Sequence, residues 1–166
     1  MRIKKLAACS AAAAIAATFF SAPAYAGTAT TTFQVTADVV ATCIIGATGL
    51  DFTNYDSAAG NKDVTSTVSV TCSNGSAYNV GLDKGIGTGA SVTARKMTGP
   101  GGVLLNYALY RDSGRTQNWG ETIGTDTKTG TGSGANQDLT VYGRIPASQY
   151  AVIGHYADTI TATVTF

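Results

Sequence analysis

The sequence predicts an all-β fold, a sandwich or barrel of short antiparallel strands, on three observations. Apolar and polar residues alternate with period two along six separate runs, turn-forming residues separate these runs, and no window of a dozen residues carries the apolar stripe of a helix. Thr, Gly, Ala, Val and Ser dominate, while charged residues make up only 13% of the chain. That composition suits half-buried pleated surfaces and turns better than helices.

Each alternating run is expected to be a half-buried strand, with one face on a core and the other in water. The runs cover residues 33–39, 68–72, 78–82, 105–109, 139–145 and 160–166. Turn signals interrupt the pattern at residues 74–75, 84–89, 99–102 and 130–134. The chain contains no linker or repeat, so we expect one domain.

Residues 1–26 have the layout of a secretory signal peptide. A basic start is followed by an apolar, alanine-rich run over residues 6–20. Ala24 and Ala26 then supply small residues at the −3 and −1 positions of a cleavage site. The apolar run is short for a transmembrane anchor, which needs roughly 20 apolar residues. We therefore expect export to the periplasm and a mature domain over residues 27–166.

The charge of the exported chain argues against nucleic acid as a partner. All ten acidic residues stay after cleavage, whereas Arg2, Lys4 and Lys5 leave with the signal, which makes the net charge −2. No basic patch suited to phosphate backbones remains.

Two cysteines, Cys43 and Cys72, stay in the exported chain. A disulfide is the default for such a pair in an oxidising compartment, and it would close a loop of about 30 residues. A metal site is the alternative, but two thiols and the distant His155 make a poor zinc ligand set.

The sequence contains no recognisable catalytic motif. His155 is the one histidine, and no Gly-x-Ser-x-Gly turn accompanies it. The glycine clusters at residues 85–89 and 130–134 lack the spacing of phosphate-binding loops, and the scattered aspartates lack the spacing of a calcium loop. We therefore predict no enzymatic activity, no cofactor and no metal.

Six segments, taken in order, resemble the spore coat protein U (SCPU) domain family, and together they span nearly all of the exported chain. They are FQVTADVVATC at 33–43, LDFTNYD at 50–56, TVSVTCSNG at 67–75, LLNYALYRD at 104–112 with the following Arg115, Thr116, Trp119 and Gly120, LTVYGRIP at 139–146, and YADTITATVTF at 156–166. The segments at 33–43 and 50–56 resemble the family's first two strands.

The resemblance implies a subunit of an archaic, Csu-type chaperone–usher pilus, at the cell surface and active in adhesion and biofilm formation. It implies an immunoglobulin-like sandwich that lacks its final strand. A periplasmic chaperone lends that strand first, and at the outer-membrane usher the N-terminal segment of an identical or related subunit replaces it.

Two segments are expected to carry these contacts. The segment from about residue 27 to residue 38 is expected to form the donor strand, with Phe33, Val35 and Ala37 inserted into the neighbour's groove. The closing strand is expected to face the chaperone through Ile160, Ala162, Val164 and Phe166.

Two other functions remain open at this stage. The chain could be a secreted coat or matrix protein that no usher assembles. It could also be a small carbohydrate-binding module, with Trp119 and the tyrosines lining a sugar site, although the same aromatic residues would serve equally as core.

Overall fold

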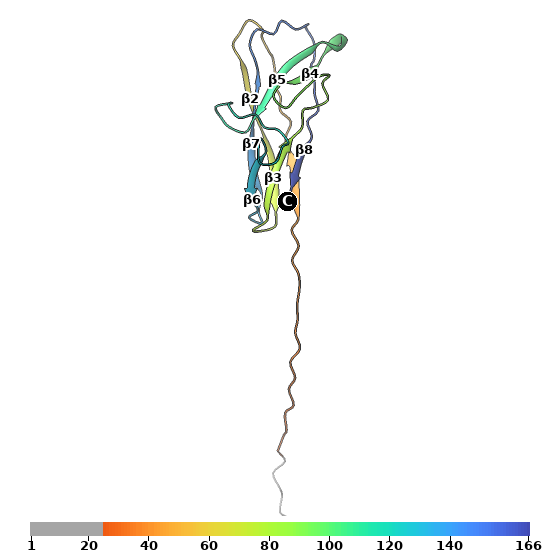
Figure 1. The fold of residues 1–166 in the computed structure, drawn as a ribbon, viewed down its shortest axis with the longest axis vertical. Helices are drawn as coiled ribbons and strands as arrows, with labels where there is room; N and C mark the ends of the chain where they lie inside the picture. Colours follow the sequence, from red (N-terminus) through yellow and green to blue (C-terminus); the bar gives the residue numbers. More distant parts are fainter. Residues whose placement is uncertain (1–24) are drawn as a thin grey trace, which may run out of the picture. The chain divides into compact units, whose positions relative to one another are not determined.

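Eight strands carry the fold in the computed structural model, which describes residues 25–166 (Figure 1). One short 3-10 helix, η1 (Pro100–Gly102), lies between the fourth and fifth strands. The strands are β1 (Cys43–Ala47), β2 (Lys62–Cys72), β3 (Ala77–Leu82), β4 (Arg95–Thr98), β5 (Leu104–Tyr110), β6 (Lys128–Thr131), β7 (Gln137–Ile145) and β8 (Ala162–Thr165).

The chain divides into two units, one ending at Ala37 and the other running from Asp38 to Phe166. All eight strands belong to the second unit. Within the first unit, residues 25–37 contain neither helix nor strand. The expected signal peptide lies almost wholly outside the described residues. In residues 25–166 there is no helix with the length and apolar character needed to cross a bilayer.

The strands form two antiparallel sheets that face each other as an immunoglobulin-like sandwich. The larger sheet has the order β1-β2-β7-β5-β4 and the smaller the order β6-β3-β8. The longest ladder joins β2 to β7, from the pair Lys62–Ile145 to the pair Val70–Gln137. In the described chain β1 pairs with β2 alone and β8 with β3 alone, so each is an edge strand.

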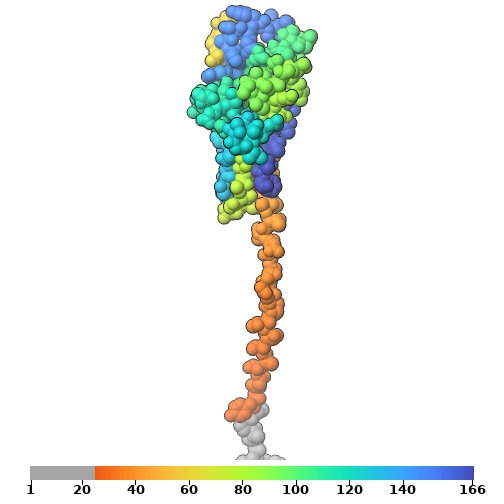
Figure 2. Space-filling view, in the orientation of Figure 1, coloured from red at the N-terminus to blue at the C-terminus, as the bar shows by residue number. Residues whose placement is uncertain are grey.

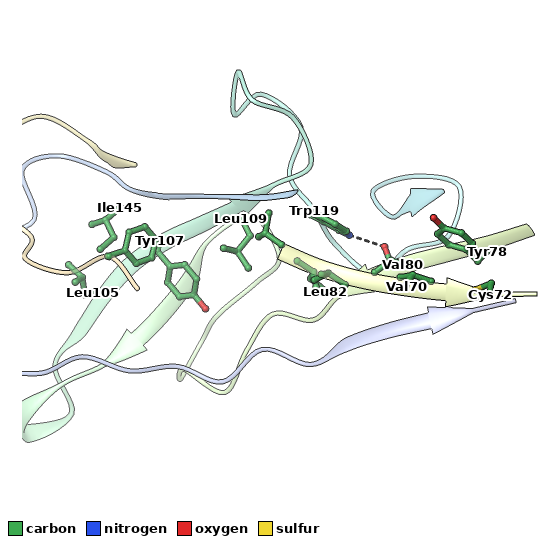
Figure 3. Packing of buried hydrophobic residues seen from close by; sticks show 13 residues of the cluster. Val70, Cys72, Tyr78, Val80, Leu82, Leu105, Tyr107, Leu109, Trp119 and Ile145 are labelled. Atoms are coloured by element: carbon green, nitrogen blue, oxygen red, sulfur yellow. Dashed lines mark hydrogen bonds between the residues drawn. The ribbon is translucent and has the colours of Figure 1, made fainter. Parts of the chain in front are cut away.

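The core lies between the sheets and is built from the alternating apolar positions (Figure 3). Val70 of β2 and Val80 of β3 are completely buried, as is Trp119 from the connection between β5 and β6. The Trp119 indole Nε1–H donates to the Val80 carbonyl oxygen at 2.8 Å, so its polar atom is satisfied inside the core. Burial of each such side chain contributes roughly 1.5–3 kcal/mol.

One charged side chain is also buried in this core. The Arg95 guanidinium is fully enclosed, and it donates to the carbonyl oxygens of Leu82 at 2.9 Å and Trp119 at 2.6 Å. It also donates to the Asp83 carbonyl at 2.8 Å. Burial lowers the pKa of Arg95 from its ordinary value, and these carbonyl groups replace the water that the cation has lost. Arg95 thereby fastens β4 to the end of β3.

Most of the predicted strands are confirmed. The runs at 68–72, 78–82, 105–109 and 139–145 lie within β2, β3, β5 and β7. The run at 160–166 is right only in part, because β8 begins at Ala162 and ends at Thr165. Sequence alternation did not reveal β1, β4 or β6, since these strands are only four or five residues long.

The turn predicted at residues 130–134 is wrong at its start. Gly130 and Thr131 are the last residues of β6, which pairs with β3. A Cβ atom at Gly130 would lie 2.4 Å from the Tyr78 ring, so glycine at this position makes room for an aromatic side chain rather than for a turn.

The strand predicted at residues 50–56 is also wrong. The segment has no assigned strand, although Phe52 is buried and meets the Tyr107 ring edge-on at 6.1 Å between centroids. The resemblance to a family strand therefore holds for the burial of its Phe52 side chain, but its backbone has no partner ladder in the described chain.

Candidate functional site

A large cavity of about 1130 Å³ lies between the two sheets, and its lining combines apolar with polar residues. Its lining includes core side chains of both sheets, among them Val68, Tyr107 and Ile145 from the larger sheet and Leu82 from the smaller one. Two segments that are not strands, residues 48–57 and 151–160, line the rest. The cavity thus occupies a part of the sandwich where neither edge strand continues.

The first wall is the segment that follows β1. Thr48 N–H donates to the Thr67 carbonyl at 2.9 Å, which continues the pairing of β1 with β2 by one residue. The chain then turns, and the Asp51 carboxylate accepts the Thr53 N–H at 2.7 Å. Beyond this turn the wall is held by side chains, above all by Phe52 in the core.

The second wall is the segment that leads into β8. Ala157 exchanges two backbone hydrogen bonds with Thr98 of β4, of 2.9 and 3.1 Å. Thr161 accepts from the Asp83 N–H at 3.1 Å and donates its own N–H to the Asp83 carboxylate at 3.0 Å. All of these bonds lie on the side of β3 and β4. Within the described chain, the backbone of Ile160 bonds to no other segment.

A buried polar contact fixes this second wall. The Tyr107 hydroxyl donates to Asp158 Oδ2 at 2.7 Å, and the Ile86 N–H donates to Asp158 Oδ1 at 2.8 Å. Burial, and next the hydrogen bond to the Asp158 carboxylate, raise the pKa of Tyr107 above its ordinary value, so the phenol keeps its proton. Any Cβ at Gly85 would collide with the Asp158 carboxylate, which explains the glycine there.

The structure brings three of the four predicted closing-strand residues onto one face. Ile160, Ala162 and Val164 are half-buried and pack against the core, while the threonines between them are exposed. Phe166 follows the end of β8 and is 55% exposed, and it is not part of the core cluster. β8 lies side by side with β3 on the face in Figure 2.

The predicted donor-strand residues lie in a segment without secondary structure. Phe33 and Val35 are 85% and 82% exposed, and Ala37 is exposed as well. The expectation of a strand at residues 33–39 is therefore not met in this chain alone, since a strand needs a partner to satisfy its backbone. The role of these residues as a donor strand stays a prediction.

The predicted disulfide between Cys43 and Cys72 is confirmed. It joins the first residue of β1 to the last residue of β2, which face each other directly across the ladder. Ser73 N–H donates to the Thr42 carbonyl at 2.9 Å just beyond it. Both thiols that the alternative metal site required are consumed by this bond.

The structure also bears on the aromatic residues considered for sugar binding. Trp119 is completely buried, so it cannot stack on a sugar ring. His155 is exposed at the rim of the cavity. Sequence reasoning missed residues 151–158 as a cavity wall, because no apolar alternation marks them, and it missed the contact of Tyr107 with Asp158 across 51 positions.

The model of the Spore Coat Protein U domain family matches residues 29–163. The chain belongs to this family. It is also similar to Protein U of Myxococcus xanthus, with 36% identity over 159 residues, covering 87% of this chain and 88% of that protein. The resemblance drawn from the sequence segments is thereby confirmed.

Among solved structures, this SCPU-family chain is similar to a chain in the crystal structure of the CsuC–CsuE chaperone–tip adhesion subunit pre-assembly complex from the archaic chaperone–usher Csu pili of Acinetobacter baumannii. The TM-score is 0.59 at 22% sequence identity, over 77% of this chain. This chain spans only 40% of the length of that one. The likeness establishes a shared fold.

Proposed function

We propose that this SCPU-family protein is a structural subunit of a chaperone–usher surface pilus that serves adhesion and biofilm formation. The observation that carries the proposal is the cavity between the sheets, which is walled by the segment that follows the edge strand β1 and by the segment that leads into the edge strand β8. A sandwich with such an opening has room for one further strand.

The physical chemistry of an open sandwich supports assembly with partners. Unpaired strand edges and exposed apolar surface favour aggregation unless something covers them. A strand supplied by another chain satisfies the backbone and places every second side chain in the cavity. A periplasmic chaperone supplies this strand before assembly, and a neighbouring subunit supplies it at the outer-membrane usher.

The N-terminal segment of the next subunit is the donor in this proposal. Residues 27–38 carry Phe33, Val35 and Ala37 at alternate positions, and these side chains are exposed in the chain by itself. A contact between one end of a subunit and the groove of another is heterologous and does not close, so it builds a filament. Export through the signal peptide at residues 1–26 brings the subunit to this machinery.

Removal of the donor segment tests the proposal. A chain lacking residues 27–34 should be exported, oxidised and held by the chaperone, because its own sandwich and groove are intact. It should still accept a neighbour's strand but have none to give, so it can only end a filament. Electron microscopy of cells that express this variant alone should show no filaments of normal length.

A matched control keeps residues 27–34 and changes one residue on the face of the segment opposite to Phe33 and Val35. Thr32→Ser changes one exposed hydroxyl-bearing side chain next to Phe33 and should leave filament length unchanged. Filaments of normal length from the deletion variant would contradict the proposed role of the N-terminal segment.

Membership of the Spore Coat Protein U domain family favours a second candidate, a secreted coat or matrix protein that no usher assembles. Neighbouring genes for a periplasmic chaperone and an outer-membrane usher would separate the two, because only the pilus subunit depends on them.

A further inference from the structure

We propose a specific register for the donor strand, in which residues 28–38 of one copy run antiparallel to residues 155–165 of the next, with Phe33 opposite Ile160 and Asp38 opposite His155. The inference rests on the proposed function. It adds the length of the pairing, its alignment, and a polar contact that marks its end.

The acceptor edge, residues 155–165, can be delimited from the alternation of exposed and half-buried side chains along it. From His155 to Thr165 each odd-numbered residue is exposed and each even-numbered one is half-buried, although β8 itself covers only Ala162–Thr165. The alternation stops at Gly154, which has φ +155 and packs against Pro100. Eleven residues therefore have the side-chain pattern of one continuous strand, and the proposed donor segment 28–38 has the same length.

The direction in which the backbone groups point limits the possible alignments. Ala157 and Thr161 use their N–H and C=O groups on the side of β4 and β3. Because these groups alternate along a strand, Asp158, Ile160 and Val164 present theirs to the other side, and their side chains face inward. An antiparallel partner must place its own inward residues opposite these. The inward residues of the donor segment are Phe33, Val35 and Ala37. They lie opposite inward residues of the acceptor in one register and in any register shifted from it by two residues, but not in one shifted by a single residue.

The outer face is compatible with this register. With Phe33 opposite Ile160, three cross-strand pairs of threonine form on the exposed face, and such pairs stabilise antiparallel ladders. They are Thr28 with Thr165, Thr30 with Thr163 and Thr32 with Thr161. A shift of two residues in either direction keeps threonine pairs of this kind, so they do not decide the register alone.

The polar groups at the rim decide it. Asp38 and His155 are both exposed, and an imidazole N–H can donate to a carboxylate. Shifting the donor by two residues places Asp38 opposite Ala157 in one direction. In the other it places Asp38 opposite Ile153, which is 98% exposed and lies beyond the alternating segment. One register alone pairs the carboxylate with the imidazole.

Cysteine cross-linking in the assembled filament tests the register. Thr30→Cys and Thr163→Cys in the same chain should form disulfides between neighbouring subunits under mild oxidation, because opposite residues of this kind are about 4.5 Å apart at Cα. The two control variants combine Thr30→Cys with Thr161→Cys or with Thr165→Cys. Their Cα atoms would be about 8 Å apart, beyond the usual limit for a disulfide. Non-reducing gels should show a ladder of covalent multimers for the first variant alone.

The outcomes separate this register from the proposed function. Filaments that cross-link through a control pair would overturn the register and leave donor-strand assembly standing. Filaments that cross-link through none of the three pairs would overturn antiparallel pairing with residues 155–165. A chain that forms no filaments, even without added cysteines, would overturn the proposed function itself, and the register with it.

A charge exchange tests the contact at the rim. His155→Asp should slow the replacement of the chaperone by a synthetic peptide of residues 27–42 by roughly threefold, as expected for like charges directly opposite each other. The same peptide with Asp38→Lys should restore the rate at which the chaperone is replaced on the His155→Asp subunit. Equal rates for all combinations of peptide and subunit would contradict the contact.

Discussion

The contact between Tyr107 and Asp158 shows how a single pair of side chains shapes the groove. Tyr107 projects from β5 in the larger sheet, whereas Asp158 belongs to the wall that leads into β8. The carboxylate accepts three hydrogen bonds: one of 2.7 Å from the phenol, and one of 2.8 Å each from the Ile86 N–H and from the adjacent Thr159 N–H. The pair therefore fixes the distance between the wall and the floor of the cavity.

We expect Tyr107→Phe to lower the free energy of unfolding by about 1–3 kcal/mol, the cost of leaving a partly buried acceptor without its donor. Urea denaturation of the purified mature chain measures the effect. Tyr110→Phe is the matched control, since Tyr110 is half-buried on the same strand and its hydroxyl makes no hydrogen bond to any of residues 25–166. Equal losses in the two variants would show that Asp158 gains nothing from the phenol.

A second pair, Asp63 with Arg144, lies on the outer surface between β2 and β7. The guanidinium binds both carboxylate oxygens at 2.7 Å, and this hydrogen bonding holds the pKa of Asp63 below its ordinary value. Stability from this pair is present above the ordinary pKa of aspartate and is lost as the pH falls through the lowered one. Because both side chains are partly exposed, the contribution is within about 1 kcal/mol.

At the scale of the element, β8 contributes to both the sheet and the cavity. Its pairing with β3 completes the smaller sheet, with Val164 opposite Val80, and its first residue, Ala162, lines the cavity. Because inward side chains and outward threonines alternate strictly, a change at one position affects one face alone.

We expect Val164→Asp to reduce co-purification with the chaperone, because it places an unpaired charge among core side chains at a cost of several kcal/mol. Thr163→Asp is the matched control, since Thr163 is the adjacent exposed residue and its charge would stay in water. If the chaperone still bound both Val164→Asp and a chain lacking the last four residues, the closing strand could not be its recognition element.

Period-two alternation located β2, β3, β5 and β7, because these strands are long enough to show the pattern and have one buried face. The strand at residues 50–56 was implied by the family resemblance and not by alternation, and there Leu50 and Phe52 contact the core without a backbone partner. Side-chain burial and strand pairing are separate requirements, and alternation reports only the first.

The cavity between the sheets could be predicted only in part. The apolar face of Ile160, Ala162 and Val164 was visible in the sequence, since it depends on neighbours two positions apart. The opposite wall and the contact of Tyr107 with Asp158 depend on residues that are far apart in the chain, and no local pattern records such pairs.

For the whole molecule, an unfilled groove means that stability depends on what occupies it. In the proposed assembly, a chaperone strand or a neighbour's strand binds the folded chain and not the unfolded one, so it raises the apparent stability as its concentration rises above its dissociation constant. The isolated subunit is then the least stable state on the assembly pathway. Features that act without any partner are most important in that state.

The disulfide between Cys43 and Cys72 is such a feature. It spans 29 positions of sequence and fastens β1, a five-residue edge strand, to the end of β2. In the chain-entropy account, closing a loop of this length removes roughly 3–4 kcal/mol of conformational freedom from the unfolded chain. This contribution is independent of any strand in the groove.

We therefore expect the paired change Cys43→Ser and Cys72→Ser to lower the free energy of unfolding by about 2–5 kcal/mol, as for native disulfides in small secreted domains. Urea denaturation of the oxidised protein and of the paired variant measures the difference. A peptide of residues 27–42 should raise both midpoints, whereas the gap between the two proteins should persist, because the peptide acts on the folded state and the disulfide on the unfolded one. If saturating peptide closed the gap, the disulfide would instead be acting on the folded state, by holding β1 in place beside the groove.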